Sequence, residues 1–231
     1  LDLSEERLAE RRAALGAAGE RLTPVVADVS DTDALPAVLE QAFSSSDGVD
    51  HVVNCAASFL AAGVGATRAD WDRSLGVNVT GSAMLTAYAA GRMPRGGTVV
   101  NISSISAHIA QSDRWTYNAT KAAIVALTRG QALDLAPRGI RVNAVSPGWI
   151  WTAEVAKAAD GDRDRWEPVW GRYHMLERLG EPSEVADAVL YLSSDGSSFI
   201  TGTELMVDGG YCAMGPEGLG DTAVFAGTDA G

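Results

Sequence analysis

The sequence is poor in cysteine, in lysine and in long apolar runs. Its two cysteines, Cys55 and Cys212, lack the spacing of metal ligands or of a disulfide framework, so we expect no metal site and a reducing, cytoplasmic location. No apolar run reaches about 18 residues, which excludes a transmembrane helix. The 18 Lys and Arg residues face 30 Asp and Glu residues, giving a net charge of −12. Such a surface repels phosphate groups, so neither nucleic acid nor a membrane is an expected partner.

The 231 residues are 46% hydrophobic and 21% charged. This balance is typical of a globular protein with one sizeable core, and it excludes a disordered, collagen-like or coiled-coil chain. The sequence contains no internal repeat, no low-complexity linker and no break in composition. We therefore predict a single domain over residues 1–231.

Short apolar runs rich in β-branched residues alternate with longer stretches of helical period. This alternation predicts βαβ units and hence an α/β fold, a doubly wound, Rossmann-like parallel sheet within three αβα layers. We expect strands at 22–27, 51–55, 97–102, 140–146 and 204–207. We expect helices at 4–18, 32–43, 69–93, 115–136 and 182–194. Residues 149–180, which hold four tryptophans, break the alternation and are interpreted as an inserted substrate lid, and residues 211–231 as a glycine-rich tail.

The first βα unit of such a sheet is not found in the sequence. A doubly wound nucleotide-binding sheet begins with a strand and a glycine-rich phosphate loop, whereas Leu1-Asp2-Leu3-Ser4 leads directly into a helical pattern. Gly16-Ala-Ala-Gly19 has no strand before it, and nothing follows Gly227-Thr-Asp-Ala-Gly231. We expect the molecule to carry a further βα unit of about 30 residues before Leu1.

Tyr117 and Lys121 lie four residues apart, and so on one face of the helix expected at 115–136. An ammonium beside a phenol favours the phenolate, so Lys121 is expected to lower the pKa of Tyr117 from about 10 and to make it a general acid/base. Five tyrosines and two lysines in 231 residues give about 0.04 such spacings by chance, from composition alone.

Ser104 and Asn78 are further candidates. Ser104 follows the strand expected at 97–102, at the carboxyl end where open α/β sheets bind ligands, so it is placed to hold a substrate oxygen. A turn-capping or helix-capping serine is the alternative. Asn78, in Gly76-Val-Asn-Val-Thr-Gly81, is a mediocre helix former within the long helix expected there. An interruption of the helix at this point would expose a carbonyl group.

Together, Asn78, Ser104, Tyr117 and Lys121 resemble, in order and spacing, the catalytic tetrad of the short-chain dehydrogenase/reductase family. The resemblance covers residues 1–211 and includes four further motifs, namely Asp28-Val29, Asn54-Cys-Ala-Ala57, Pro147-Gly-Trp-Ile-Trp-Thr152 and Val207-Asp-Gly-Gly210. Cys55 and Ala57 depart from the Asn and Gly that are usual in the second motif.

The resemblance implies a nicotinamide cofactor. Asp2, next to Leu3, corresponds to the acidic residue that accepts hydrogen bonds from the adenosine ribose, and its charge would repel a 2′-phosphate, which favours NAD over NADP. Lys121 would bind the nicotinamide ribose and Thr152 the carboxamide. The implied cofactor-binding residues are Asp2, Leu3, Asp28, Val29, Asn54, Ala56, Tyr117, Lys121, Pro147, Gly148, Ile150 and Thr152.

The implied activity is hydride transfer between NAD and a small secondary alcohol or ketone. Tyr117 would exchange the proton of the substrate hydroxyl, Ser104 would hold its oxygen, and Asn78 would anchor a water that relays protons through Lys121. Aromatic side chains suit a cyclic or sugar-like substrate, although packing is the alternative for each of them. The expected substrate contacts are Ser104, Trp115, Trp149 and Trp151, with added polar contacts from His108, Arg114 and His174.

The helices expected at 69–93 and 115–136 are rich in small residues, and in relatives these faces build dimers and tetramers, so a homotetramer or homodimer is expected. Two other functions stay open. A 3-oxoacyl-[acyl-carrier-protein] reductase of the same family normally prefers NADP and docks an acidic carrier, which Asp2 and the charge of −12 disfavour. A non-catalytic scaffold without a phosphate loop is disfavoured by the intact tetrad, and NADH binding separates it from an enzyme.

Overall fold

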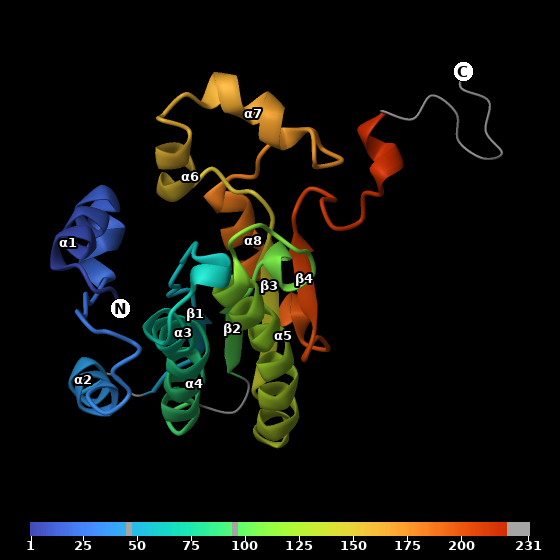
Figure 1. Cartoon of the computed structure of the whole chain (residues 1–231). Coiled ribbons are helices and arrows are strands. Elements are labelled where there is room, and N and C mark those ends of the chain that lie inside the picture. Colours follow the sequence, from blue (N-terminus) through green and yellow to red (C-terminus); the bar gives the residue numbers. More distant parts are fainter. Residues whose placement is uncertain (45–47, 94–96, 221–231) are drawn as a thin grey trace.

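The computed structural model describes residues 1–44, 48–93 and 97–220 (Figure 1). Four parallel strands form one sheet in the order of the sequence, β1 (His51–Asn54), β2 (Thr98–Ile102), β3 (Arg141–Pro147) and β4 (Glu204–Val207). β2 and β3 are almost wholly buried, as expected of parallel strands covered on both faces. The strands predicted at 51–55, 97–102, 140–146 and 204–207 are confirmed.

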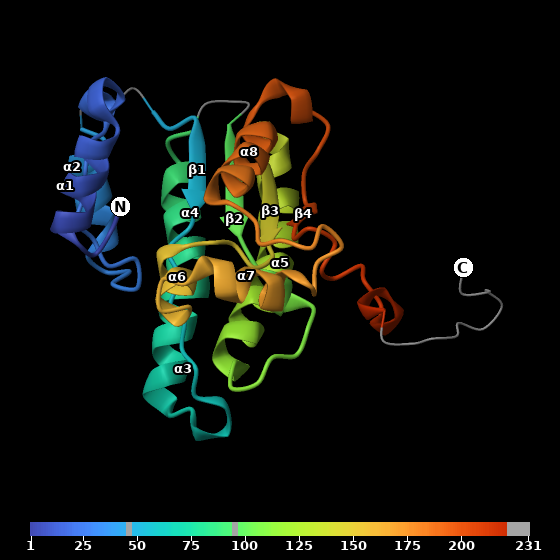
Figure 2. The same cartoon turned by 90° about the horizontal axis from the view of Figure 1, so that it is seen from above.

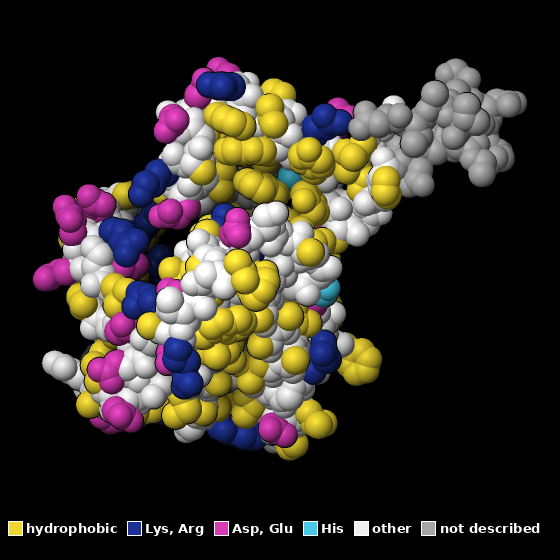
Figure 3. Space-filling model, in the orientation of Figure 1, with side chains coloured by type: hydrophobic (Ala, Val, Ile, Leu, Met, Phe, Trp, Pro, Cys, Tyr) yellow, Lys and Arg dark blue, Asp and Glu magenta, His cyan; other side chains and the backbone are white. Residues whose placement is uncertain are grey.

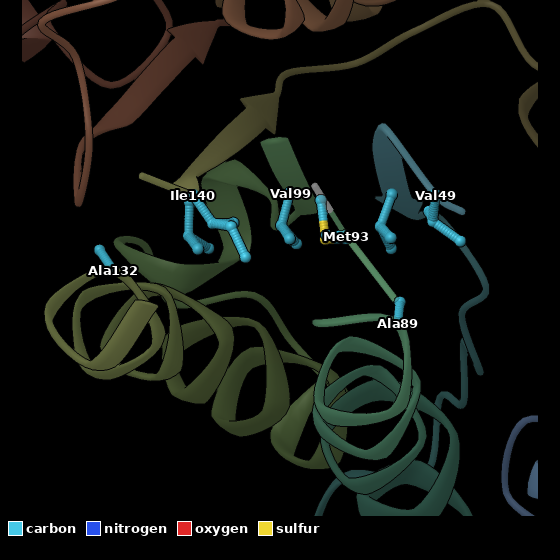
Figure 4. Close-up of a cluster of buried hydrophobic side chains, with 8 residues drawn as sticks. Val49, Ala89, Met93, Val99, Ala132 and Ile140 are labelled. Atoms are coloured by element: carbon cyan, nitrogen blue, oxygen red, sulfur yellow. The ribbon is translucent and has the colours of Figure 1, made fainter. Parts of the chain in front are cut away.

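Helices cover both faces of the sheet, which gives three layers (Figure 1, Figure 2). α4 (Ser82–Ala90) and α5 (Trp115–Leu135) pack on one face, and α8 (Pro182–Ser193) packs on the other. Figure 4 shows the apolar cluster between α4, α5 and the sheet, in which Val99 is fully buried. A second cluster around Val145 lies under α8. The predicted three-layer α/β fold is confirmed.

The ends of the helices coincide with capping residues, proline and glycine in the sequence. α1 (Glu5–Ala14) starts after Ser4, whose Oγ accepts a hydrogen bond from the backbone N–H of Arg7 at 3.2 Å, and α8 starts with Pro182. The helix predicted over 4–18 is shorter than expected, because Gly16 adopts a φ of +53° and a 3₁₀ turn follows over Gly16–Arg21. The helix predicted over 32–43 is α2 (Leu35–Ala42).

Residues 22–27 do not form the predicted strand. Val26 makes a single parallel bridge with Asp2, between hydrogen bonds from Asp2 N to Val25 O (3.2 Å) and from Ala27 N to Asp2 O (3.0 Å). α1 and α2 lie together on this side of the molecule, beyond β1 (Figure 2). A cavity of about 480 Å³, lined by Val25 and by Val52 of β1, separates the segment from the sheet. Among the described residues, the segment therefore has no strand beside it on which a ladder could extend.

The helix predicted over 69–93 is divided into α3 (Arg68–Leu75), a π-helical turn (Gly76–Gly81) and α4. The turn brings Gly81 close to the loop that holds Val29. A Cβ on Gly81 would lie 2.6 Å from the carbonyl oxygen of Val29. Turns of this kind are frequent at functional sites. The interruption that Asn78 predicts is thus present, as one widened turn.

Residues 149–180 contain two short helices, α6 (Ala153–Ala158) and α7 (Arg163–Gly171), which follow the carboxyl end of β3. In Figure 1 both helices lie beyond the ends of the strands. The tail includes a 3₁₀ turn at Pro216–Leu219, and residues 221–231 lie outside the described residues.

Candidate active site

Ser104, Tyr117 and Lys121 meet beside the carboxyl end of β2. Ser103 and Ser104 directly follow Ile102, the last residue of that strand, and α5 carries the other two side chains. Lys121 Nζ donates a hydrogen bond to the carbonyl oxygen of Ile102 at 2.8 Å, and Ser103 Oγ donates one to the carbonyl oxygen of Lys121 at 2.9 Å. These bonds fix the first turns of α5 against the end of the strand.

Tyr117 is a partly buried phenol in the first turn of α5. Its ring meets the Phe59 ring edge to face, with 4.7 Å between the two centroids. Lys121 Nζ lies 5.5 Å from the centroid of the Tyr117 ring. Burial raises the pKa of Tyr117 above its ordinary value, whereas a hydrogen bond with Ser104 and the positive charge of Arg114 act in the opposite direction. The sequence predicts a lowered pKa. Burial outweighs the favourable charges, so the phenol is protonated at neutral pH.

Lys121 is 3% exposed, and burial lowers its pKa to about 8. In the described part of the chain, one of its three N–H donors is used, by the carbonyl oxygen of Ile102. An ammonium held in a low-dielectric environment with donors to spare can bind hydroxyl groups strongly. This arrangement suits the predicted role of Lys121 toward a ribose.

Asn78 is 2% exposed, and its side chain joins two other elements. Its Oδ1 accepts a hydrogen bond from the N–H of Ser58 at 2.6 Å, and its Nδ2 donates to the carbonyl oxygen of Ser58 (3.0 Å) and to Oγ1 of Thr120 (2.9 Å). The amide thereby ties the loop after β1 to the residue that precedes Lys121. Asn78 therefore holds these two segments together, and its role in proton relay stays a prediction.

Ser104 takes the capping role that the sequence offers as the alternative, and its role toward a substrate oxygen stays a prediction. Its Oγ accepts a hydrogen bond from the N–H of Ser106 at 3.1 Å and caps the 3₁₀ turn Ile105–Ala107. The Ser104 side chain also acts to lower the pKa of Tyr117, against the effect of burial. Ser104 is buried, with 9% of its surface exposed.

Asp2 also serves as a helix-start residue. Its Oδ1 accepts a hydrogen bond from the N–H of Ser4 at 2.9 Å and lies 3.2 Å from Nη2 of Arg7. Leu3, the neighbouring candidate, is 53% exposed. The sequence places no basic residue closer than Arg7, but the first turn of α1 brings that guanidinium to the carboxylate. Arg7 thus offsets the negative charge that favours NAD.

Three of the candidates for adenosine contacts, Val29, Asn54 and Ala56, line the 480 Å³ cavity. Asn54 Nδ2 donates to Oδ1 of Asn101 at 2.7 Å, whereas Asn54 Oδ1 is buried without a hydrogen-bond partner in the described part of the chain. Asp28 Oδ1 accepts hydrogen bonds from Oγ and N of Ser30, which lower the pKa of Asp28.

The turn after β3 packs firmly on its neighbours. Gly148 N donates to the carbonyl oxygen of Val207 at 3.0 Å, and a Cβ at Gly148 would lie 2.9 Å from Cα of Asp208. Ile150 bridges to Gly180, and Thr152 Oγ1 caps α6 by accepting from Val155 N at 3.4 Å. Pro147, the last residue of β3, starts this turn. The predicted nicotinamide contacts therefore lie on a braced turn.

These groups fit a nicotinamide dinucleotide. The unpartnered acceptor of Asn54 suits a hydroxyl donor, the buried ammonium of Lys121 suits the acceptors of a ribose, and both lie near the carboxyl ends of parallel strands. The described residues include no group of three or more His, Cys, Asp or Glu side chains placed to hold a metal ion. Among them, no helix has the length and apolar character needed to cross a membrane.

The lid tryptophans pack mainly on one another. Trp149 stacks on Trp170 with 5.3 Å between centroids, Trp166 stacks on Trp170 at 4.9 Å, and the guanidinium of Arg163 covers Trp151 at 5.2 Å. Trp115, at the start of α5, is 55% exposed. These contacts are those that the packing alternative expects, Trp115 is the more exposed ring, and substrate contact by Trp149 or Trp151 stays a prediction.

The two histidine candidates lie in other environments. His174 is 2% exposed, accepts a hydrogen bond from Trp149 N at 3.4 Å, and lines a second cavity of about 380 Å³. His108 pairs with Glu204 at 2.8 Å. These partners hold both rings in place, and contact of either ring with a substrate stays a prediction.

Sequence reasoning missed two residues of the site. Phe59 packs on Tyr117, and Thr120 binds Asn78. Thr120 lies inside Tyr117-Asn-Ala-Thr-Lys121, and Phe59 follows Asn54-Cys-Ala-Ala57 by two residues, so closeness to a motif was the available signal.

The chain is similar to a family model, to relatives in sequence and to solved structures. A family model described as enoyl-(acyl carrier protein) reductase matches residues 1–212. The cis-4-hydroxycyclohexanecarboxylate dehydrogenase of Sinomonas cyclohexanicum is 35% identical over 87% of this chain and 81% of its own length. The 3-oxoacyl-[acyl-carrier-protein] reductase FabG of Thermotoga maritima is 35% identical over 90% and 85%. A Brucella melitensis crystal structure, described as a short-chain dehydrogenase/reductase and glucose/ribitol dehydrogenase, has a TM-score of 0.82 at 32% identity, covering 91% and 84%.

Proposed function

The chain belongs to the short-chain dehydrogenase/reductase family, whose members are oxidoreductases of alcohols and ketones that use a nicotinamide cofactor, and we propose that it interconverts a small secondary alcohol and ketone with NAD. The observation that carries this proposal is the placement of Tyr117. It is a protonated phenol, influenced by the Ser104 hydroxyl and 5.5 Å from a buried ammonium, at the edge of the sheet where ligands bind.

In reduction, Tyr117 donates its proton to the substrate oxygen, and in oxidation the phenolate takes the proton of the hydroxyl group. Ser104 holds the same oxygen by a hydrogen bond. Lys121 binds the nicotinamide ribose and stabilises the phenolate while it exists, because its positive charge is buried close to the ring. Asn78 positions Lys121 through Thr120. The nicotinamide, when bound, accepts or supplies the hydride.

NAD is the proposed cofactor because Asp2, the acidic residue that the family motifs place at the adenosine ribose, would repel the 2′-phosphate of NADP. The ion pair with Arg7 weakens this preference, so discrimination against NADP should be moderate. The proposed contacts are those the family motifs imply, namely Asp2, Leu3, Asp28, Val29, Asn54, Ala56, Tyr117, Lys121, Pro147, Gly148, Ile150 and Thr152.

We propose a cyclic or polyol-like substrate, covered by the lid 149–180 of a single domain. Exposed Trp115 supports a ring-shaped substrate, and two relatives are named for a hydroxycyclohexane acid and for glucose or ribitol. A homodimer or homotetramer is proposed as the working assembly, and a cytoplasmic location stays a prediction.

The test replaces Tyr117 by Phe, which removes the hydroxyl group and keeps the ring. Turnover of a panel of cyclic ketones and polyols should fall by about a thousandfold or more, since proton transfer is lost. Binding of NADH, followed by enhancement of its fluorescence, should be retained. A Tyr117→Phe variant with most of the wild-type turnover contradicts the assignment. Wild-type protein that does not bind NADH favours the non-catalytic scaffold.

A further inference from the structure

Three side chains form a stack beside the candidate active site. The guanidinium carbon of Arg114 lies 4.2 Å from the centroid of the Phe59 ring, and the Phe59 ring meets the Tyr117 ring at 4.7 Å. Arg114 directly precedes α5, and Phe59 lies in the loop after β1. A positive charge is thereby held one ring away from the phenol that moves the proton.

Arg114 is among the arginines that form no ion pair with an acidic side chain in the described part of the chain. Five arginines form ion pairs with acidic side chains in the described part of the chain, namely Arg7, Arg68, Arg92, Arg163 and Arg178. Arg114 forms none there, and the neighbouring Asp113 directs its carboxylate over Gly63. Stacking on the face of Phe59 uses none of the guanidinium N–H donors, which stay available to a planar acceptor.

The stack is also accessible. Phe59 is 55% exposed, so a ligand that reaches Tyr117 from solvent passes this ring. The net charge of −12 repels anions at long range, and an unpaired guanidinium provides local attraction where it lies. Carboxylates are the planar, bidentate acceptors that such a fork matches.

We propose that the substrate is an alcohol or ketone that carries a carboxylate, and that Arg114, supported by Phe59, binds this group while Tyr117 meets the reacting oxygen. The inference rests on the proposed function of Tyr117. It identifies Arg114 as the residue that selects anionic over neutral substrates of the same shape.

Binding is tested first, by calorimetric titration in the presence of NADH. Cyclohexanecarboxylate should bind about ten- to a hundredfold more tightly than cyclohexanecarboxamide, as expected for a charge-assisted pair of hydrogen bonds. Arg114→Gln should abolish this difference. The matched control is Arg92→Gln, because Arg92 also lies over a ring, Tyr88 at 5.5 Å, but beside the amino end of β1. Equal affinity of the wild type for both ligands overturns the proposal.

Kinetics give a second readout, from 4-oxocyclohexanecarboxylate and its carboxamide. The wild type should prefer the carboxylate in kcat/KM, and Arg114→Gln should remove the preference chiefly by raising KM. Arg114 also lowers the pKa of Tyr117, but this change affects the turnover of both ketones equally. The ratio of kcat/KM for the carboxylate to kcat/KM for the carboxamide therefore reports only on recognition of the carboxylate. An unchanged ratio in Arg114→Gln overturns the inference. Absence of turnover of every ketone, with carboxylate binding intact, contradicts the proposed function instead.

Discussion

At the scale of single residues, the site combines two side chains, Tyr117 and Lys121, whose charged forms are disfavoured by burial. Tyr117 is kept as a phenol and Lys121 is pushed toward the neutral amine, because the surroundings of both favour uncharged forms. Active sites commonly hold such perturbed groups at a cost in stability. The cost is measurable here because Lys121 is almost fully buried.

Replacing Lys121 by Met should separate stability from activity. The folded-state pKa of about 8 lies below the ordinary 10.5, so the buried ammonium costs about 3 kcal/mol at pH 7. As pH rises through 8 toward 10.5 the folded chain releases its proton before the unfolded chain, and wild-type stability recovers. The free energy of unfolding of the wild type, relative to Lys121→Met, should therefore rise by about 2 kcal/mol between pH 7 and 9.5 in urea titrations.

The control for this experiment is the other lysine. Lys157 lies exposed on α6, so Lys157→Met should change the free energy of unfolding by less than about 0.5 kcal/mol at either pH. Lys121→Met should also lose turnover. If the difference in the free energy of unfolding between the wild type and Lys121→Met does not vary with pH, burial of the ammonium imposes no such cost.

The sequence predicts which residues meet better than it predicts what they do there. Spacing is enough to put Tyr117 and Lys121 on one face of α5, because helical geometry is local. It does not bring Arg7 to Asp2 or Phe59 to Tyr117, since both contacts depend on how separate segments pack. The pKa of Tyr117 was mispredicted for the same reason, because burial is a property of the folded molecule.

At the scale of elements, four strands and α8 are predicted closely, because buried parallel strands are continuous apolar runs. Residues 22–27 have the same composition but lie beside a cavity, and a strand requires a partner on which to form its ladder. The π-helical turn at Gly76–Gly81 depends on a close approach to Val29 that periodicity does not reveal.

The π-helical turn provides a stability prediction. A Cβ at Gly81 would lie 2.6 Å from O and 3.0 Å from C of Val29, both backbone atoms, so Gly81→Ala must displace the loop or the turn. We expect a loss of about 2 kcal/mol in the free energy of urea unfolding, as for overpacked cores. Gly65→Ala is the matched control, because nothing lies within 4 Å of its Cβ, and it should change stability by under about 0.5 kcal/mol. Equal effects of the two substitutions would contradict this packing account.

At the scale of the whole molecule, exposed apolar side chains gather on one pair of helices. Figure 3 shows apolar side chains gathered over α4 and α5, where Leu133 is 76% and Met84 is 44% exposed. Exposed apolar residues that cluster on paired helices are typical of an interface between subunits.

Leu133→Asp should therefore weaken self-association. A charge placed on α5 would be buried without a partner if the α4–α5 faces of two copies met, which costs several kcal/mol. Light scattering coupled to size-exclusion chromatography should give a lower mass for Leu133→Asp than for the wild type at equal concentration. Leu15→Asp, at the end of α1 and 45% exposed, introduces the same charge away from these helices and should keep the wild-type mass. If Leu133→Asp retains the wild-type mass while Leu15→Asp lowers it, the subunits associate through the side of the molecule that carries α1.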